Sequence, residues 1–161
     1  MLIRQVQGSD LEVIATIESD NFSPQEATTR AVLEERSIRL IPDTFLVALI
    51  DQEIVGYIEG PVVTTPILED SLFHGVTKNP KTGGYIAITS LSIAKRFQQQ
   101  GVGTALLAAL KDLVVAQQRT GLILTCHDYL ISYYEMNGFI NQGISESQHG
   151  GTLWYQMIWK L

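Results

Sequence analysis

The sequence has little cysteine, few charged residues and no long apolar run, and the first and last of these shortages each exclude a class of protein or site. Its 161 residues include a single cysteine, Cys126, which excludes an internal disulfide and a cysteine-based zinc site. Charged residues make up 17% of the chain, below the roughly 25% of a typical soluble domain. No apolar stretch approaches the roughly 20 residues that span a bilayer, and Met1–Val6 does not resemble a signal peptide. We therefore expect a cytoplasmic protein that does not cross a membrane.

Basic residues are also scarce and scattered, and the net charge is −6. Domains that bind nucleic acids usually carry a basic stripe or block, so we expect no nucleic-acid partner here. The three histidines, His74, His127 and His149, are far apart in the sequence, and we expect no metal site. An acidic balance is compatible with a cationic small substrate.

Hydrophobic patterning and length predict one mixed α/β domain covering residues 1–161. Expected strands are 2–6, 44–50, 54–64, 86–93, 121–126, 139–144 and 152–160, with a hairpin loop at 145–151. Expected helices start at the capping boxes of Ser9 and Ser23, the second ending near Arg36, and cover 102–116 and 129–137. A short helix is expected at 66–74. We expect a mostly antiparallel sheet with a parallel centre, flanked by helices.

The turn between the strand 86–93 and the next helix is the most informative stretch. It contains two glycines one residue apart, Gly101 and Gly103, where the helix begins. Glycine has no Cβ, so the backbone can approach a ligand closely. The free N–H groups of the first helical turn and the positive end of the helix dipole then face that ligand. This arrangement predicts a phosphate or pyrophosphate site.

Three kinds of turn compete for this stretch. A P-loop needs a lysine after its last glycine, where this chain has Thr104, and a dinucleotide-binding turn needs a third glycine where it has Leu106. A strand-to-helix turn with glycines for packing alone remains as an alternative at this point.

The pattern Gln98-x-x-Gly101-x-Gly103 is similar to the pyrophosphate-binding motif of the GNAT acetyltransferases. That resemblance covers nearly the whole chain and is strongest over 86–139. It implies a single α/β GNAT domain, acetyl-CoA as co-substrate, and N-acetyltransferase activity.

A second mark of the family lies downstream, where Tyr134-x-x-x-Gly138-Phe139 follows a helix cap near Asp128. Within the family, the turn 97–101 and the stretch 124–128 resemble the serotonin (arylalkylamine) N-acetyltransferases most closely.

The resemblance also implies roles for individual residues. Leu91 would polarise the thioester carbonyl with its backbone N–H, and Tyr134 would give a proton to the departing CoA sulfur. A phenol with a pKa of about 10 suits this role, because it is protonated at pH 7 yet can release its proton. Tyr133 is the competing residue and points about 100° away on a helix. The expected acetyl-CoA-binding residues are Leu91, Ser92, Ile93, Gln98, Gln99, Gln100, Gly101, Val102, Gly103, Thr104, Asp128 and Tyr134.

The general base is left open by the sequence. Serotonin acetyltransferases carry two histidines on the fourth strand, where this chain has Ala87 and Thr89. The base is then Glu59, a water held by Thr89 or Ser90, or no group at all if the amine arrives neutral. Cys126 and His127 do not form a catalytic pair, because adjacent strand residues point to opposite faces. From the resemblance we therefore expect only acyl transfer to the primary amine of a small molecule or peptide, and not a specificity for arylalkylamines.

Three functions remain in competition. The expected one is an acetyl-CoA-dependent N-acetyltransferase, which Tyr134 favours over a non-catalytic acyl-CoA-binding sensor. A dinucleotide-binding enzyme is the third. Acceptor specificity is expected in 23–39 and 65–84, the least patterned segments. The apolar strand 152–160 has two interpretations, the edge of a homodimer or part of the core.

Overall fold

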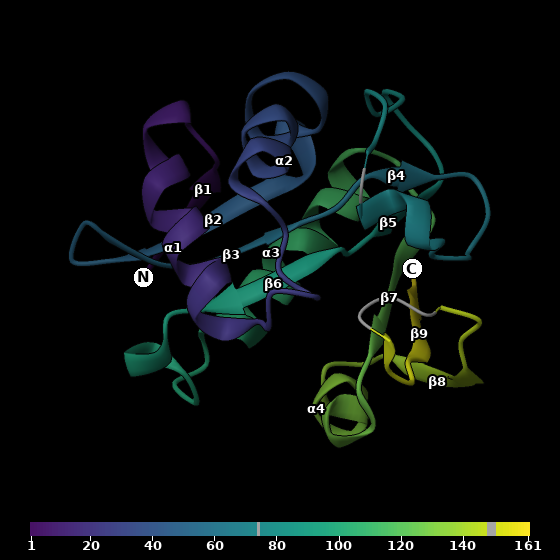
Figure 1. The fold of residues 1–161 in the computed structure, drawn as a ribbon. Coiled ribbons are helices and arrows are strands. Elements are labelled where there is room, and N and C mark those ends of the chain that lie inside the picture. Colours follow the sequence, from purple (N-terminus) through teal and green to yellow (C-terminus); the bar gives the residue numbers. More distant parts are fainter. Residues whose placement is uncertain (74, 148–150) are drawn as a thin grey trace.

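The computed structural model describes residues 1–73, 75–147 and 151–161, which form two sheets that diverge from a shared centre (Figure 1). The first sheet has the order β1-β2-β3-β6 and is antiparallel throughout. Its strands are β1 (Leu2–Gln5), β2 (Phe45–Ile50), β3 (Glu53–Glu59) and β6 (Ser90–Ile93). The second sheet has the order β4-β5-β7-β9-β8, in which β5 and β7 are parallel. Its strands are β4 (Val62–Val63), β5 (Tyr85–Ala87), β7 (Gly121–Cys126), β8 (Ile140–Ile144) and β9 (Tyr155–Lys160). The expected mixed sheet with a parallel centre is confirmed.

The strand expected at 86–93 is divided between the two sheets. The N–H of Ile88 donates to the carbonyl of Ile123 on β7 at 2.8 Å, and the next N–H, of Thr89, donates to Glu59 on β3 at 2.9 Å. From this point β6 follows β3 and diverges from β7 (Figure 1). Gly60 permits the crossing, since a Cβ there would lie 1.8 Å from the carbonyl oxygen of Ala87. The result is an opening between β6 and β7.

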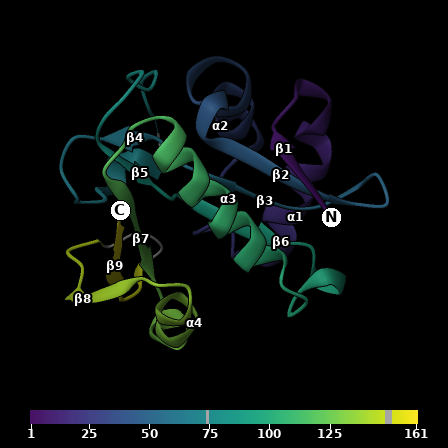
Figure 2. The ribbon, with the colours of Figure 1, turned by 180° about the vertical axis from the view of Figure 1, so that it is seen from behind.

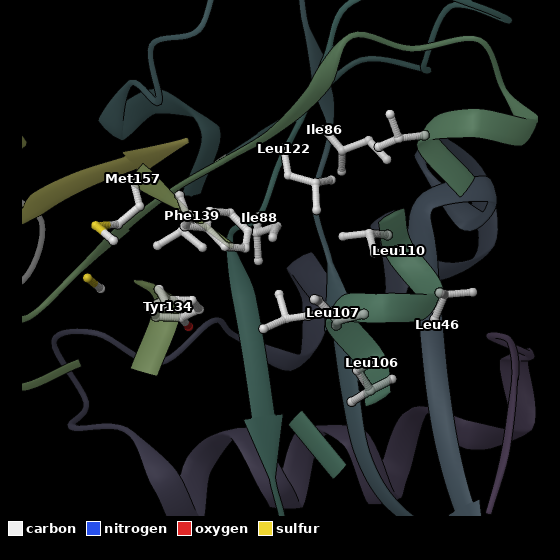
Figure 3. Close-up of a cluster of buried hydrophobic side chains, with 14 of the residues drawn as sticks. Leu46, Ile86, Ile88, Leu106, Leu107, Leu110, Leu122, Tyr134, Phe139 and Met157 are labelled. Atoms are coloured by element: carbon white, nitrogen blue, oxygen red, sulfur yellow. The ribbon is translucent and has the colours of Figure 1, made fainter. Parts of the chain in front are cut away.

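Helix α3 (Val102–Ala116) crosses the back of the sheets, and α1 (Leu11–Asn21) and α2 (Arg30–Glu35) lie on the other side (Figure 2). The predicted apolar stripe of α3 is confirmed. Figure 3 shows its leucines directed at the centre of the molecule, where Ile86, Ile88 and Leu122 meet them. Each fully buried side chain of this size stabilises the fold by roughly 1.5–3 kcal/mol. This packing fixes the first turn of α3 beside the opening.

The two N-terminal capping predictions were wrong in detail. Residues Gly8–Asp10 form a short 3-10 turn, in which Asp10 rather than Ser9 supplies the cap and accepts the N–H of Gln7 at 2.8 Å. Helix α2 begins after Thr29 instead of at Pro24, and Arg36–Leu40 continue it as a π-helical turn.

The late start of α2 has a specific cause. The N–H of Thr28 donates to the carboxylate of Glu18 at 2.8 Å, and this bond holds the backbone outside a helix. The hydroxyl of Thr29 then caps α2 through the N–H of Val32, at 3.3 Å. Before α2, residues 24–26 form a separate turn, in which the carbonyl of Ser23 accepts the N–H groups of Glu26 and Ala27.

The remaining connections follow the expected order with shifted bounds. Asp51 and Gln52 both have positive φ, as a tight hairpin turn between β2 and β3 requires. A helix was expected at 66–74, and the described part of that range, 66–73, contains only a short 3-10 turn, Asp70–Phe73. Helix α4 (Ile131–Met136) ends at Gly138, whose φ of 87° confirms the predicted left-handed residue.

The C-terminal strand lies inside the second sheet. β9 pairs with β7 on one side and β8 on the other, so the interpretation of this strand as a dimer edge was wrong. The expected loop 145–151 joins β8 to β9, but its residues 148–150, including His149, lie outside the described residues, as does His74. Within the described ranges, no helix combines the length and the apolar character needed to cross a membrane.

Candidate active site

Two cavities meet at the opening between β6 and β7. The larger, here called the α3 groove, has a volume of about 430 Å³ and lies at the N-terminus of α3. The smaller, here called the α1 cavity, has a volume of about 160 Å³ and lies beside the C-terminal end of α1. Both are lined by Asn21, Phe22, Leu91, Tyr129, Leu130 and Tyr134. The two cavities therefore adjoin along these shared residues.

The α3 groove is built by the glycine turn. Gly101 precedes α3 with a φ of 85°, a conformation that a residue with a Cβ rarely adopts. Gly103 lies close to α4, since a Cβ there would lie 2.4 Å from the hydroxyl oxygen of Tyr133 and would displace that side chain. The first N–H groups of the 15-residue helix α3 have no partner within the helix and face this groove. The groove is therefore suited to an anion such as a diphosphate.

The exposed edge of β6 forms the floor between the cavities. The N–H of Ala94 donates to Val55 on β3 at 2.8 Å. The backbone N–H and C=O groups of successive strand residues point to alternate sides. Those of Leu91 and Ile93 therefore point away from β3 and into the opening. The carbonyl of Ile93 already accepts hydrogen bonds from Asn21, at 2.6 Å, and Gln98, at 3.0 Å. The amide of Leu91 is thus placed toward the centre of the opening.

Tyr134 lies where the two cavities join. Only 8% of the residue is exposed, and its ring stands edge-on to Tyr133 and Phe139, with ring centroids 5.2 and 5.7 Å away. Figure 3 shows it beside Phe139 at the end of the core. Burial raises the pKa of Tyr134 above its ordinary value, so the phenol is protonated at neutral pH. Tyr133 lines the α3 groove but not the α1 cavity.

One wall of the α1 cavity carries stacked rings. The ring of His127 stacks between those of Tyr129 and Trp154, with centroid distances of 5.3 and 4.4 Å. The Nε2 atom of His127 lies 3.3 Å from the carboxylate of Glu26. Cys126 also lines the cavity, and burial raises its pKa to about 11. Its thiol is therefore protonated at neutral pH and a poor nucleophile.

Glu18 is an acidic group in the same cavity, and the sequence reasoning did not single it out. The residue is 2% exposed, and its carboxylate accepts the N–H of Thr28 at 2.8 Å and the hydroxyl of Tyr57. Burial raises the pKa of Glu18 to about 7, against the opposing effect of these hydrogen bonds. A signal was present in the sequence, since Glu18 follows Leu11 and Ile14 at helical spacing on the buried stripe of α1.

Glu59, the predicted base, lies in a different environment. It is completely buried and pairs with Arg36, whose Nη1 atom is 2.9 Å from the carboxylate. Thr89 donates its hydroxyl to Glu59 at 2.7 Å, and Arg36 also donates to the carbonyl of Leu72. Neither Glu59 nor Arg36 lines the α3 groove or the α1 cavity. This geometry favours a structural role for Glu59, and its role as a base stays an untested prediction.

The predicted ligand-binding residues are gathered at the α3 groove, apart from two. Gln100 directs its side-chain amide to the carbonyl of Arg96 at 3.0 Å, and Asp128 is exposed on a 3-10 turn; neither lines the groove. Asn21 and Phe22, from the end of α1, line it although the glycine motif gave no sign of them.

Comparison with known proteins supplies an independent line of information. The sequence profile of the acetyltransferase (GNAT) family matches residues 11–139. A comparison with curated protein sequences found no match.

Among solved structures, the ribosomal-protein-alanine N-acetyltransferase from Brucella melitensis is 21% identical, with a TM-score of 0.71 and 100% of both chains covered. Rv2747 from Mycobacterium tuberculosis, solved in complex with CoA and NLQ, is 12% identical, with a TM-score of 0.70 and coverage of 100% of this chain and 99% of that one. The loading GNATL domain of CurA from Lyngbya majuscula is 13% identical, with a TM-score of 0.82 and coverage of 99% and 96%. At these identities the likeness concerns the fold.

Proposed function

The chain belongs to the acetyltransferase (GNAT) family, and from that premise we propose that it transfers the acetyl group of acetyl-CoA to a primary amine. The observation that carries the proposal is the position of Tyr134 where the α3 groove meets the α1 cavity. A donor in the first cavity and an acceptor in the second then share one proton donor. A sensor that only binds acyl-CoA has no need of the second cavity.

The α3 groove fits the donor. The diphosphate of acetyl-CoA binds the backbone N–H groups from Gln99 to Thr104, where no Cβ obstructs it at positions 101 and 103. The pantetheine arm follows the open edge of β6, which runs from this turn to the opening. The thioester then lies beside the amide of Leu91 and the hydroxyl of Tyr134. In this placement the diphosphate is bound by backbone N–H groups at the start of helix α3 rather than by a cluster of basic side chains.

Transfer takes place by direct attack of the amine. The amine nitrogen bonds to the thioester carbon, and the N–H of Leu91 stabilises the negative oxygen that forms. The C–S bond breaks, and Tyr134 gives its proton to the departing thiolate. The phenolate then takes the proton lost by the new amide nitrogen. A route through an acetylated Cys126 is disfavoured, because its pKa of about 11 keeps the thiol protonated.

The acceptor is a small amine with a flat or apolar body. The α1 cavity measures about 160 Å³ and carries the stacked rings of His127, Tyr129 and Trp154. This lining supports the resemblance to the arylalkylamine group, although Ala87 and Thr89 occupy the positions of that group's histidines.

We expect acetyl-CoA to raise the melting temperature of the protein, because a ligand that binds only the folded state stabilises it by about 2.7 kcal/mol at 100 times its Kd. NAD is expected to have no effect. Release of CoA is then measured with a panel of amines: 2-phenylethylamine, spermidine, an aminoglycoside, and a peptide with a free N-terminus. Stabilisation by NAD, or none by acetyl-CoA, would contradict the proposal. Stabilisation by acetyl-CoA without release of CoA would favour the sensor.

A matched pair of glycine variants shows where acetyl-CoA binds. Gly101 and Gly143 both have positive φ and open surroundings, so alanine costs roughly 1–2 kcal/mol of stability at either position. Only Gly101→Ala is expected to reduce the rise in melting temperature that acetyl-CoA causes. An equal response of the two variants would place the donor elsewhere.

A further inference from the structure

We infer that Glu18 is the residue that takes the proton from the acceptor's ammonium group, and that the α1 cavity therefore binds amines that arrive protonated. This inference rests on the proposed acetyl transfer and adds the general base that the sequence left open. It replaces neither Tyr134 nor Leu91, which act on the thioester.

The position of Glu18 is the first argument. It lines the α1 cavity together with Tyr134 and Leu91, whereas Glu59 lines neither cavity. The carboxylate is held from two directions, by the N–H of Thr28 and the hydroxyl of Tyr57, which are donors. Each carboxylate oxygen has a further lone pair for an incoming N–H group. Glu18 is thus a fixed acceptor in the cavity that borders the site of attack.

The charges around Glu18 supply the second argument. It is 2% exposed, and Tyr57 and Glu59 face it from β3, the latter already neutralised by Arg36. The other ionisable pair that lines the cavity is Glu26 with His127. No lysine or arginine side chain lines the α1 cavity within the described residues. An ammonium group entering there is attracted by Glu18, and its binding repays part of the carboxylate's desolvation.

The proton balance is complete without any further reagent. The ammonium N–H bond breaks and its proton passes to the Glu18 carboxylate, giving a neutral amine and a neutral carboxylic acid. The amine attacks acetyl-CoA, and Glu18 later releases the proton to water. The pKa of about 7 for Glu18 is well matched to this exchange, because an ideal base has a pKa near the working pH. Below that pH the group is protonated, so activity is lost as pH falls.

The test compares Glu18→Gln with the wild type and with Glu12→Gln, an exposed position on the same helix. The probe is whichever amine of the panel has the highest kcat/KM, assayed from about pH 5.5 to 9.5. As the pH rises, kcat/KM of the wild type and of Glu12→Gln is expected to increase with a midpoint near pH 7 and then to reach a plateau. Glu18→Gln is expected to lose at least tenfold in kcat/KM at neutral pH. The kcat/KM of Glu18→Gln is expected to increase about tenfold for each unit of rising pH, because only the free amine reacts in this variant.

The outcomes separate this inference from the proposed function. A Glu18→Gln enzyme with the wild-type pH profile overturns the role of Glu18 and leaves acetyl transfer intact. A wild-type protein that releases no CoA with any amine overturns the proposed function, and the role of Glu18 with it.

Where Glu18→Gln fails to fold, the wild type is assayed with the same amine and its β,β-difluorinated analogue, whose ammonium group is more acidic. An acid limb that stays near 7 for both amines supports an enzyme group as the base. A limb that moves with the pKa of the amine overturns the inference.

Discussion

Replacing Tyr134 with phenylalanine is expected to lower kcat at least tenfold, while the stabilisation by acetyl-CoA is unchanged. The substitution removes one oxygen from a buried ring and keeps its edge-on packing against Phe139. Acid catalysis by a positioned side chain typically contributes about 10²- to 10⁴-fold, so the loss falls on the chemical step rather than on binding. Steady-state kinetics with the best amine of the panel measure kcat, and thermal shifts with acetyl-CoA measure donor binding.

Two further tyrosine variants identify the cause of any loss. Tyr85→Phe changes a buried tyrosine that lines neither cavity, and its kcat is expected to equal that of the wild type. Tyr133→Phe tests the neighbour that lines only the α3 groove. Normal turnover in Tyr134→Phe would remove Tyr134 from the mechanism. A loss confined to Tyr133→Phe would assign the proton donor to Tyr133.

Replacing Glu59 with glutamine is expected to reduce the free energy of unfolding by about 3–5 kcal/mol, because it leaves the charge of Arg36 buried without a counter-ion. Arg36 is 1% exposed, and its Nε atom already lacks a hydrogen-bond partner among the described residues. The exposed pair of Glu12 and Arg30 is the matched control, and Glu12→Gln is expected to cost at most about 1 kcal/mol. Urea unfolding at pH 7 measures both.

A double variant separates the charge from the packing. Arg36→Met combined with Glu59→Leu removes both charges and is expected to recover much of the stability that Glu59→Gln loses. A cost below about 1 kcal/mol for Glu59→Gln would show that water reaches this pair. Loss of the acid limb from the pH profile of folded Glu59→Gln would restore Glu59 as the base.

The sequence predicted the α3 groove because its signals are local. The apolar period of 102–116 and the two glycines before it lie within one strand-turn-helix unit, and their geometry follows from neighbouring residues. The resemblance to the family suggested Tyr134 through its spacing to Gly138 and Phe139, and its catalytic role stays a prediction. The remote part of the groove, Asn21 and Phe22 at the end of α1, gave no such local signal.

The α1 cavity was missed because its residues meet only in the folded chain. Glu18 is held by Tyr57, which is 39 residues away, and the same carboxylate delays the start of α2 by binding the N–H of Thr28. The division of the strand 86–93 likewise depends on hydrogen bonds to Ile123 and Glu59, on two different sheets. Local propensity contains no information on such contacts.

A crystal structure of the protein with bound CoA tests the central claim most directly. We predict the diphosphate on the backbone N–H groups of the first turn of α3, beside Gly101 and Gly103, with the CoA sulfur within hydrogen-bonding distance of the Tyr134 hydroxyl. A diphosphate bound elsewhere, or a sulfur that lies away from both Tyr134 and the amide of Leu91, would contradict the assignment of this site to acetyl transfer.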